Sequence, residues 1–420
     1  MYWISVASKK QLRSSLSFCY YQLLKPCLRR VVSLLPISSK VLGYPKGFYR
    51  SSLDFVKNST AVDSANRYTE IYPSHAIHRP APKTVHDNID WRFLTGYLGS
   101  EFITPSNFVL TAINARVVGN DGVVITSDDK LLADVSIEVG VTSDNAEQHS
   151  IFGRLKLPKA TRINETIAVL SALGGSNYFH WMFDILPRIH LLQKSGLLGE
   201  VDKFLINELV SSYQTETLEV LGIPNSQLIQ SHPSLHIEAA TLIIPSLPGI
   251  TGSMTKWSCD FLRESFLLRR EATSVDKPER IYISRGKAAY RRIINEIEVV
   301  EILNSLGFVV VALEKLSVVE QAAVMSSAKV VVSPHGAGLT NLVFCSQGCK
   351  VIELFAPAYV NPCYRALCNL LDLEYWYLLG KGTLPLNTSD DHLIKSVQDD
   401  IEIDINDLLK TLAAAELTTM

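Results

Sequence analysis

The sequence predicts an α/β protein with a doubly wound parallel sheet in its C-terminal part and some antiparallel β structure nearer the N-terminus. Three observations support this class. Apolar strand-like runs alternate with helix-length segments from residue 280 onward, and a turn sequence separates two apolar runs between residues 108 and 126. The chain has 420 residues, 47% of them hydrophobic, which is enough for more than one core and suggests two or three domains.

The C-terminal alternation has five expected strands, at residues 281–283, 308–313, 330–332, 351–354 and 375–379. Two of the intervening helices have recognisable starts. Asn295 and Ser317 are each followed three residues later by a glutamate, the spacing at which side chains satisfy the free amides of a helix start. Ligands of such sheets bind beyond the carboxyl ends of the strands, so we expect the site in the loops that follow them.

Upstream, the turn sequence Asn120-Asp121-Gly122 lies between apolar runs and predicts a hairpin. A strand at residues 167–171 leads through a glycine pair into a helix from about residue 178 to 194, and a further strand follows at 203–206. Residues 51–83 are expected to be a linker.

Charge is unevenly distributed along the chain. The net charge is −2, which excludes a chain-wide basic field for binding nucleic acid. Residues 1–53 nevertheless contain nine Lys or Arg and no acidic residue. This segment predicts peripheral contact with an anionic membrane, with a transit peptide or a solvated extension as the alternatives.

Cysteine and hydropathy patterns exclude other classes. The seven cysteines are spread from Cys19 to Cys368 without a Cys-x-x-Cys pair, so we expect reduced and mostly buried thiols. The longest uncharged stretches are interrupted by Gly, Asn, Pro and His and do not predict a membrane span.

The strongest local signal is a buried strand that runs into a glycine-containing turn and then a helix. Backbone amides at such a helix start bind anions, and glycine lets a phosphate approach closely. The predicted diphosphate-binding residues of this turn are His335, Gly336, Ala337, Gly338, Leu339, Thr340 and Asn341. The alternative is a tight connection without a ligand.

Three arginines follow another strand of the same predicted sheet. Arg285, Arg291 and Arg292 are expected near the turn, where guanidinium groups bind phosphate oxygens as rigid forks. Alternatively, the last two are surface residues. Asn295 is expected to be a helix cap close to the site, and Glu353, a charge inside a buried strand, is expected to bind a ribose hydroxyl.

A third group lies at the start of the helix predicted from residue 178. His180 and Asp184 are separated by four residues and therefore share one helix face. Either could be a general base, His180 held by the carboxylate or Asp184 itself. The structural alternative has His180 in the domain interface and Asp184 paired to Arg188. The chain has no Asp-x-Asp sequence that could chelate a divalent metal, so we expect no metal site.

Together, the motifs at residues 174–188, 282–285, 292–296 and 335–341 resemble glycosyltransferase family 61 in order and spacing, over roughly residues 168–380. The resemblance implies a GT-B-like fold, in which two Rossmann-like domains face each other across a cleft. It implies an inverting, metal-independent transfer of sugar from a nucleotide-sugar donor, a UDP-sugar in our expectation, to a glycan or lipid-linked hydroxyl. No other cofactor is expected.

The resemblance also divides the chain. We expect a basic extension and linker at 1–85, an acceptor-side α/β domain at 86–272, a nucleotide-sugar-binding domain at 278–385 and a helical tail at 386–420. The chain looks like bacterial family members of polysaccharide biosynthesis, which implies a cytoplasmic enzyme, at the inner membrane face if residues 1–53 bind lipid. The rival hypothesis is an inactive sugar-nucleotide or glycan-binding protein that retains the fold.

Overall fold

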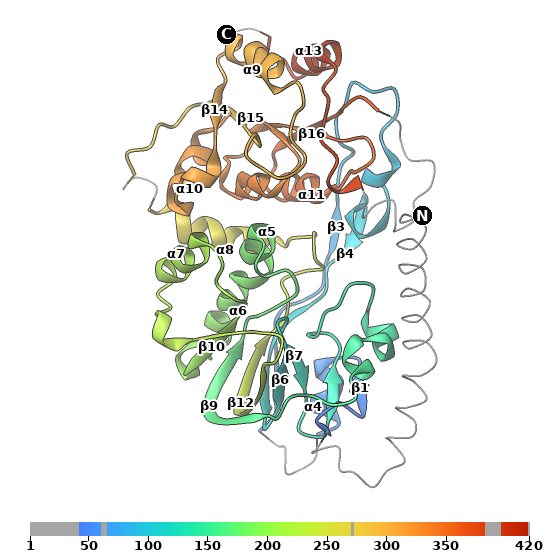
Figure 1. Ribbon diagram of the computed structural model, residues 1–420, viewed down its shortest axis with the longest axis vertical. Coiled ribbons are helices and arrows are strands. Elements are labelled where there is room, and N and C mark those ends of the chain that lie inside the picture. The colour runs from blue at the N-terminus through green and yellow to red at the C-terminus, as the bar shows by residue number, and fades with distance from the viewer. Residues whose placement is uncertain (1–41, 60–64, 270–272, 383–395, 419–420) are drawn as a thin grey trace, which may run out of the picture.

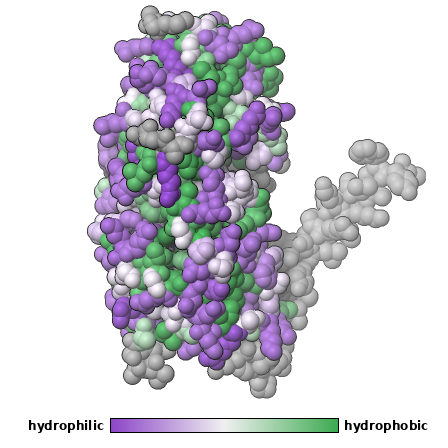
Figure 2. Space-filling model, turned by 90° about the vertical axis from the view of Figure 1, so that its left-hand side faces the viewer, coloured by the Kyte–Doolittle hydropathy of each residue, from purple (hydrophilic) through white to green (hydrophobic). Residues whose placement is uncertain are grey.

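The computed structural model describes residues 42–59, 65–269, 273–382 and 396–418. The protein is mixed α/β, as expected. Its elements form two main sheets that lie one above the other along the long axis of the molecule (Figure 1). On the face in Figure 2, hydrophilic residues surround smaller groups of hydrophobic ones. We call the two sheets the N-terminal sheet and the C-terminal sheet.

The N-terminal sheet has ten strands and mixed directions. Its parallel part has the order β12-β9-β10-β11, and the other neighbours pair antiparallel except β1 with β8. The strands are β1 (Gly47–Tyr49), β2 (Arg67–Tyr72), β5 (Asn107–Ile113), β6 (Arg116–Val118), β7 (Val123–Ile125), β8 (Lys130–Leu132), β9 (Thr161–Val169), β10 (Lys203–Ile206), β11 (Leu228–Gln230) and β12 (His236–Pro245).

The hairpin predicted around Asn120 is confirmed, because β6 and β7 pair antiparallel on either side of it. The linker predicted at residues 51–83 is wrong. This segment contains α4 (Ser52–Lys57), strand β2, which pairs with β5, and strand β3 (Ala76–His78), which pairs with β4 (Glu101–Ile103). No residue of β2 is fully buried, so the strand lacks the apolar alternation that would have revealed it.

The C-terminal sheet has the five parallel strands that the sequence predicted, in the order β14-β13-β15-β16-β17. They are β13 (Arg280–Ile283), β14 (Val309–Val311), β15 (Val330–Pro334), β16 (Lys350–Phe355) and β17 (Glu374–Leu379). Side chains of successive residues in a strand pack in different apolar clusters. In β15, Val331 belongs to one cluster and Val332 to another. Apolar side chains therefore cover both faces, which accounts for the continuous apolar runs in the sequence.

Helices cover both faces of this sheet. They are α9 (Glu296–Ser305), α10 (Val318–Ser327), the 3₁₀-helix Ala337–Phe344, α11 (Cys363–Leu370) and α13 (Ile405–Ala414). The capping box at Ser317 is confirmed, because its hydroxyl accepts the Glu320 amide and the Glu320 carboxylate accepts the Ser317 amide. The side-chain cap expected from Asn295 is wrong. Its side-chain nitrogen instead donates to the Ile403 carbonyl, and its side-chain oxygen accepts the Ile403 backbone amide. These two hydrogen bonds tie α9 to the C-terminal segment.

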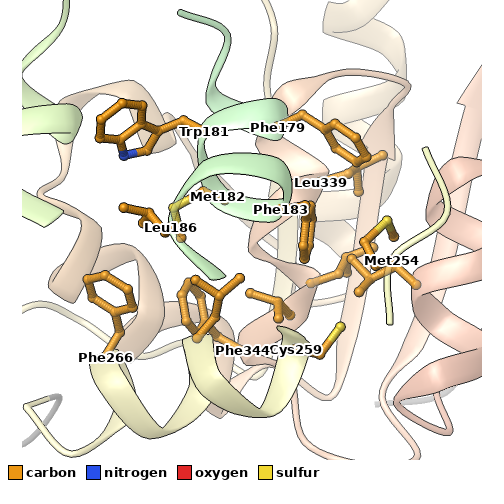
Figure 3. Packing of buried hydrophobic residues seen from close by; sticks show 14 of the residues in the cluster. Phe179, Trp181, Met182, Phe183, Leu186, Met254, Cys259, Phe266, Leu339 and Phe344 are labelled. Atoms are coloured by element: carbon orange, nitrogen blue, oxygen red, sulfur yellow. The ribbon is translucent and has the colours of Figure 1, made fainter. Parts of the chain in front are cut away.

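Helices of the N-terminal half join the two sheets through one apolar cluster. They are α5 (Tyr178–His180), the π turn Trp181–Ile185, α6 (Pro187–Ser195), α7 (Ser212–Val220) and α8 (Lys256–Leu267). Figure 3 shows side chains of α5, the π turn and α8 packed with those of the 3₁₀-helix, among them Phe183 and Leu339, both at most 2% exposed. This shared core places the start of the 178–195 helix against the C-terminal sheet.

A segment from the N-terminal half also docks on the edge of the C-terminal sheet. We call residues 79–100, which connect β3 to β4, the strap. The Lys83 amide donates to the Tyr375 carbonyl, and the Lys83 carbonyl accepts the Tyr377 amide. The guanidinium group of Arg365, on α11, is buried and donates to four carbonyls of the strap, those of Arg79, Pro80, Phe93 and Leu98.

Within the described residues, all five cysteines are free and buried, as the sequence predicted. Cys19 and Cys27 lie outside the described residues, as does most of the basic segment 1–53. Among the helices of the described part, none combines the length and the apolar character needed to span a bilayer.

Replacing Arg365 by Met should destabilise the protein, because it removes the guanidinium donor of four strap carbonyls, three of which it binds in buried surroundings. We expect the free energy of unfolding to fall by about 3 kcal/mol, measured by urea denaturation. Arg162→Met is the matched control, since Arg162 is largely exposed, and should change stability by no more than about 0.5 kcal/mol. An equally small change for Arg365→Met would contradict the strap assignment.

Candidate active site

A pocket of about 390 Å³ opens at the carboxyl ends of β13 and β15, at the edge where the sequence predicted the site. Side chains of both halves line it, because α5 and α7 lie against this edge. The lining residues are Tyr178, Tyr213, Ile283, Ser284, Arg285, Lys287, Ala288, Leu313, Glu314, Gln321, Ser333, Pro334, Ala337, Gly338 and Asn341.

Arg285 and the glycine turn meet in this pocket, as predicted. A Cβ atom at Gly336 would collide with the Arg285 guanidinium group, so glycine is required here for close approach. Burial and the nearby charge of Arg291 lower the pKa of Arg285. Among the described residues its guanidinium donates only to the Tyr290 carbonyl, and its Nε is buried without a partner.

Arg291 is the second guanidinium group of this cluster. Its φ of 58° is a left-handed conformation that is uncommon outside glycine. The guanidinium lies 5.0 Å from the ring centre of Tyr290 and 5.4 Å from that of Tyr359. Its Nε, like that of Arg285, is buried without a hydrogen-bond acceptor in the described chain. Two neighbouring cations without a carboxylate partner there form a site of positive potential.

Arg292 does not belong to the cluster, so its expected role in binding diphosphate is wrong. Its guanidinium forms an ion pair with Asp400 at 2.8 Å and is half exposed. Its backbone amide also donates to this carboxylate. Arg291 and Arg292 are adjacent in the chain, but Arg291 packs against Tyr290 and Tyr359 while Arg292 pairs with Asp400.

The predicted turn divides into a part that lines the pocket and a part that is structural. Ala337 and Gly338 line the pocket, and they begin the 3₁₀-helix, whose first amides have no acceptor within the helix. Leu339 and Thr340 are fully buried. Asn341 is also buried and accepts a hydrogen bond from the Tyr178 hydroxyl at 2.8 Å, so it joins the two halves of the protein at the pocket wall.

His335 and Glu353 form a buried pair behind the arginines. His335 Nδ1 lies 2.5 Å from Glu353 Oε1, and the Tyr375 hydroxyl donates to Glu353 Oε2 at 2.6 Å. Glu353 is 0% exposed, so both its oxygens are used inside the protein. The ribose-binding role expected of Glu353 does not fit this geometry. Its carboxylate instead orients the His335 ring, whose pKa is lowered by burial against the opposing effect of this carboxylate.

His180 and Asp184 form the pair that the sequence predicted. His180 Nδ1 lies 2.7 Å from Asp184 Oδ2, and 25% of the His180 side chain is exposed against 8% for Asp184. Asn177 begins this helix by accepting the Phe179 amide. Gly174, with a φ of 75°, passes so close to the ring of His180 that a Cβ atom there would lie 2.8 Å from it.

Arg188 does not pair with Asp184, which corrects the alternative considered for it. The guanidinium is 2% exposed and donates to the carbonyls of Leu170, Ser171 and Pro245. Burial lowers its pKa to about 9, although the charge of Asp184 acts in the opposite direction. Arg188 thus joins the end of β9, which precedes the glycine pair, to the end of β12.

A series of ring contacts links His180 to His335. His180 packs on Phe179 at 5.3 Å between ring centres, Phe179 on Tyr364 at 5.8 Å, and Tyr364 on His335 at 5.4 Å. These contacts connect the helix that carries His180 and Asp184 with the pair formed by His335 and Glu353.

Several residues at the site were missed by sequence reasoning. Glu296 accepts hydrogen bonds from the hydroxyls of Tyr282 and Ser284 and so shapes the turn that carries Arg285. Tyr213 and Gln321 line the pocket from helices in which the sequence showed no binding or catalytic motif. Only Tyr290 and Glu296 had a usable signal, since they flank the arginines in the sequence.

In the described part of the chain, no three His, Cys, Asp or Glu side chains are grouped so as to hold a metal ion.

Comparison with known proteins identifies a family for this part of the chain. Residues 178–352 match the family model of glycosyltransferase 61, a span that begins with α5 and includes both arginines and the glycine turn. The chain therefore contains a glycosyltransferase family 61 region, and the family recognised in the sequence is confirmed.

Curated relatives are glycosyltransferases of several specificities. A beta-1,2-xylosyltransferase of Oryza sativa subsp. japonica is 29% identical over 64% of this chain and 50% of its own length. A protein O-linked-mannose beta-1,4-N-acetylglucosaminyltransferase 2 of Bos taurus is 24% identical over 64% of this chain and 52% of its own. An alpha-1,3-arabinosyltransferase of the same rice is 26% identical over 47% of this chain and 38% of its own. The chain spans about half the length of the curated relatives it matches first.

Replacing Gly336 by Ala should displace the Arg285 guanidinium, because the added methyl group takes its place. We expect the affinity for UDP, measured by isothermal titration calorimetry, to fall roughly ten-fold, about 1.4 kcal/mol. Gly199→Ala is the matched control, since nothing lies near a Cβ atom at Gly199. Unchanged UDP affinity in Gly336→Ala would argue against a diphosphate at this turn.

Proposed function

We propose that this protein is an inverting, metal-independent glycosyltransferase that moves a sugar from a nucleotide-diphosphate donor to a hydroxyl group of a glycan. In this proposal its two halves act as the facing lobes of a GT-B enzyme, with the donor on the C-terminal sheet. The family match and the glycosyltransferase relatives support the class of reaction.

The observation that carries the proposal is the pair of arginines without carboxylate partners in the described chain. Arg285 and Arg291 each have a buried Nε that lacks an acceptor, and Arg285 lines the pocket together with Ala337 and Gly338, whose amides have no acceptor within the 3₁₀-helix. Phosphate oxygens would satisfy these donors, and each charge-assisted hydrogen bond is worth roughly 1.5–3 kcal/mol. The same groups would stabilise the charge of the departing diphosphate without a divalent metal.

The remainder of the pocket suits a nucleoside. Tyr178 and Tyr213 are in edge-to-face contact at 4.9 Å, and apolar side chains such as Ile283 and Leu313 complete the wall. A flat base would pack against such a surface, while Glu314 and Gln321 offer polar partners. We propose a UDP-sugar as the donor.

We propose His180 as the general base and Asp184 as the residue that orients it. In this proposal Asp184 accepts a hydrogen bond from the protonated Nδ1 of His180. Nε2 of the more exposed His180 is then free to take a proton. The acceptor hydroxyl then loses its proton to His180, and its oxygen bonds to the anomeric carbon of the donor. The bond from that carbon to the diphosphate oxygen breaks, and the nucleoside diphosphate leaves with the electron pair.

The decisive experiment measures UDP release from a panel of UDP-sugars with xylo- and manno-oligosaccharides as acceptors. We expect release that persists in EDTA and falls by roughly 10²-fold or more in His180→Ala, Asp184→Asn and Arg285→Ala. His232→Ala is the control for His180→Ala, because His232 is exposed and remote in sequence from every site residue. UDP binding without turnover would support the inactive binding protein, and full activity of Arg285→Ala would refute the diphosphate assignment.

A further inference from the structure

A second pocket lies in the N-terminal half, beside the hairpin that the sequence predicted. Its volume is about 230 Å³, and it lies between the hairpin tip, the 137–154 loop and the end of β9. The polar side chains in its wall are those of Asn120, Asp121, Glu138, His149, Ser150 and Arg154. This pocket is smaller than the roughly 300–1,000 Å³ of pockets for drug-sized ligands, so its size suits a single small unit.

The imidazole of His149 gives this pocket an unpartnered buried nitrogen. His149 is 4% exposed, and its Nδ1 accepts the Ile151 amide at 3.1 Å and lies 3.2 Å from Glu138 Oε2. Its Nε2 is buried and has no hydrogen-bond partner in the described chain. Burial lowers the pKa of His149, against the opposing effect of the Glu138 charge. A buried polar atom of this kind is costly unless a ligand or water forms a hydrogen bond with it.

Acidic side chains supply acceptors in the same wall. Glu138 binds the Ser150 amide through one carboxylate oxygen at 2.8 Å. Asp121, at the hairpin tip, is partly buried, and burial together with the charge of Glu138 raises its pKa. Arg154 is exposed at the rim and contributes further donors. Two carboxylates disfavour an anionic ligand, and this mixture of donors and acceptors matches the hydroxyl groups of a neutral sugar.

The pocket adjoins the proposed catalytic base through one short turn. Leu173 lines the pocket, and the next residue, Gly174, packs against the ring of His180. Asn207 holds the turn to the hairpin, because its amide nitrogen donates to the carbonyls of Asn120 and Ala172. Four residues beyond Gly174, Tyr178 lines the donor pocket. The segment 173–178 therefore runs from the wall of one pocket to the wall of the other, and it contacts the ring of His180.

We propose that this second pocket binds a neutral, hydroxyl-bearing sugar unit of the acceptor glycan. Asp121 and Glu138 accept hydrogen bonds from its hydroxyl groups, the Arg154 guanidinium donates to its oxygens, and His149 Nε2 forms a hydrogen bond with one of its hydroxyl groups. The proposal rests on the function proposed above, and it assigns the acceptor to the face of the N-terminal sheet next to His180.

The test measures sugar binding and donor binding separately on the full chain. Xylotriose and mannotriose are titrated by ligand-observed NMR in the presence of UDP, with wild-type protein and the variants Asp121→Asn and Arg154→Ala. We expect at least one trisaccharide to bind, and each variant to weaken this binding by roughly ten-fold while UDP affinity stays unchanged.

Asp144→Asn and Arg162→Ala are the matched controls, since both residues are exposed and neither lines the pocket. Melting temperatures equal to wild type show that the variants are folded. The acceptor assignment is overturned if both pocket variants bind the trisaccharide as tightly as the wild type. It is also overturned if neither trisaccharide binds to the wild type. Displacement of the sugar by inorganic phosphate also overturns it, because that would reveal an anion site. If the wild-type protein does not bind UDP, the proposed function is refuted instead.

Discussion

The parallel pairing of β13 with β15 places Arg285 next to Gly336, although about fifty residues separate them in the chain. Parallel strands end at the same edge of a sheet, so the loops after both strands must meet there. Close contact then depends on Gly336, which leaves room for the guanidinium group. The approach of Arg291 from the same loop produces two neighbouring cations whose buried Nε atoms lack acceptors in the described chain. This concentration of unsatisfied positive charge is the reason that we propose a donor site at this edge.

Buried polar groups hold the two halves around this edge. Glu353 accepts from Tyr375 and contacts His335 without exposure to solvent, and Arg365 satisfies four carbonyls of the strap. Each of these groups would be costly to bury alone, and each is stable only because its partners come from distant segments. The same interactions that fix the fold therefore also fix the orientation of the side chains at the pocket.

Sequence reasoning recovered the features that depend on local order. The five strands of the C-terminal sheet, the hairpin at Asn120 and the pair formed by His180 and Asp184 follow from apolar runs, a turn sequence and a four-residue spacing. It failed where a partner was remote in sequence. Arg292 binds Asp400, and Asn295 binds Ile403, because the C-terminal segment returns to α9, and no local pattern indicates that return.

Sequence reasoning alone was sufficient for the α/β class, the five strands of the C-terminal sheet and the family that residues 178–352 match. These follow from hydrophobic periodicity and from motifs, which are properties of neighbouring residues. The tertiary structure alone shows that Arg285 lines the pocket while Arg292 pairs with Asp400, that Glu353 contacts His335, and that the strap crosses between the halves. Such assignments depend on which side chains meet in three dimensions, and charges or hydrogen bonds between distant residues leave no periodic trace in the chain.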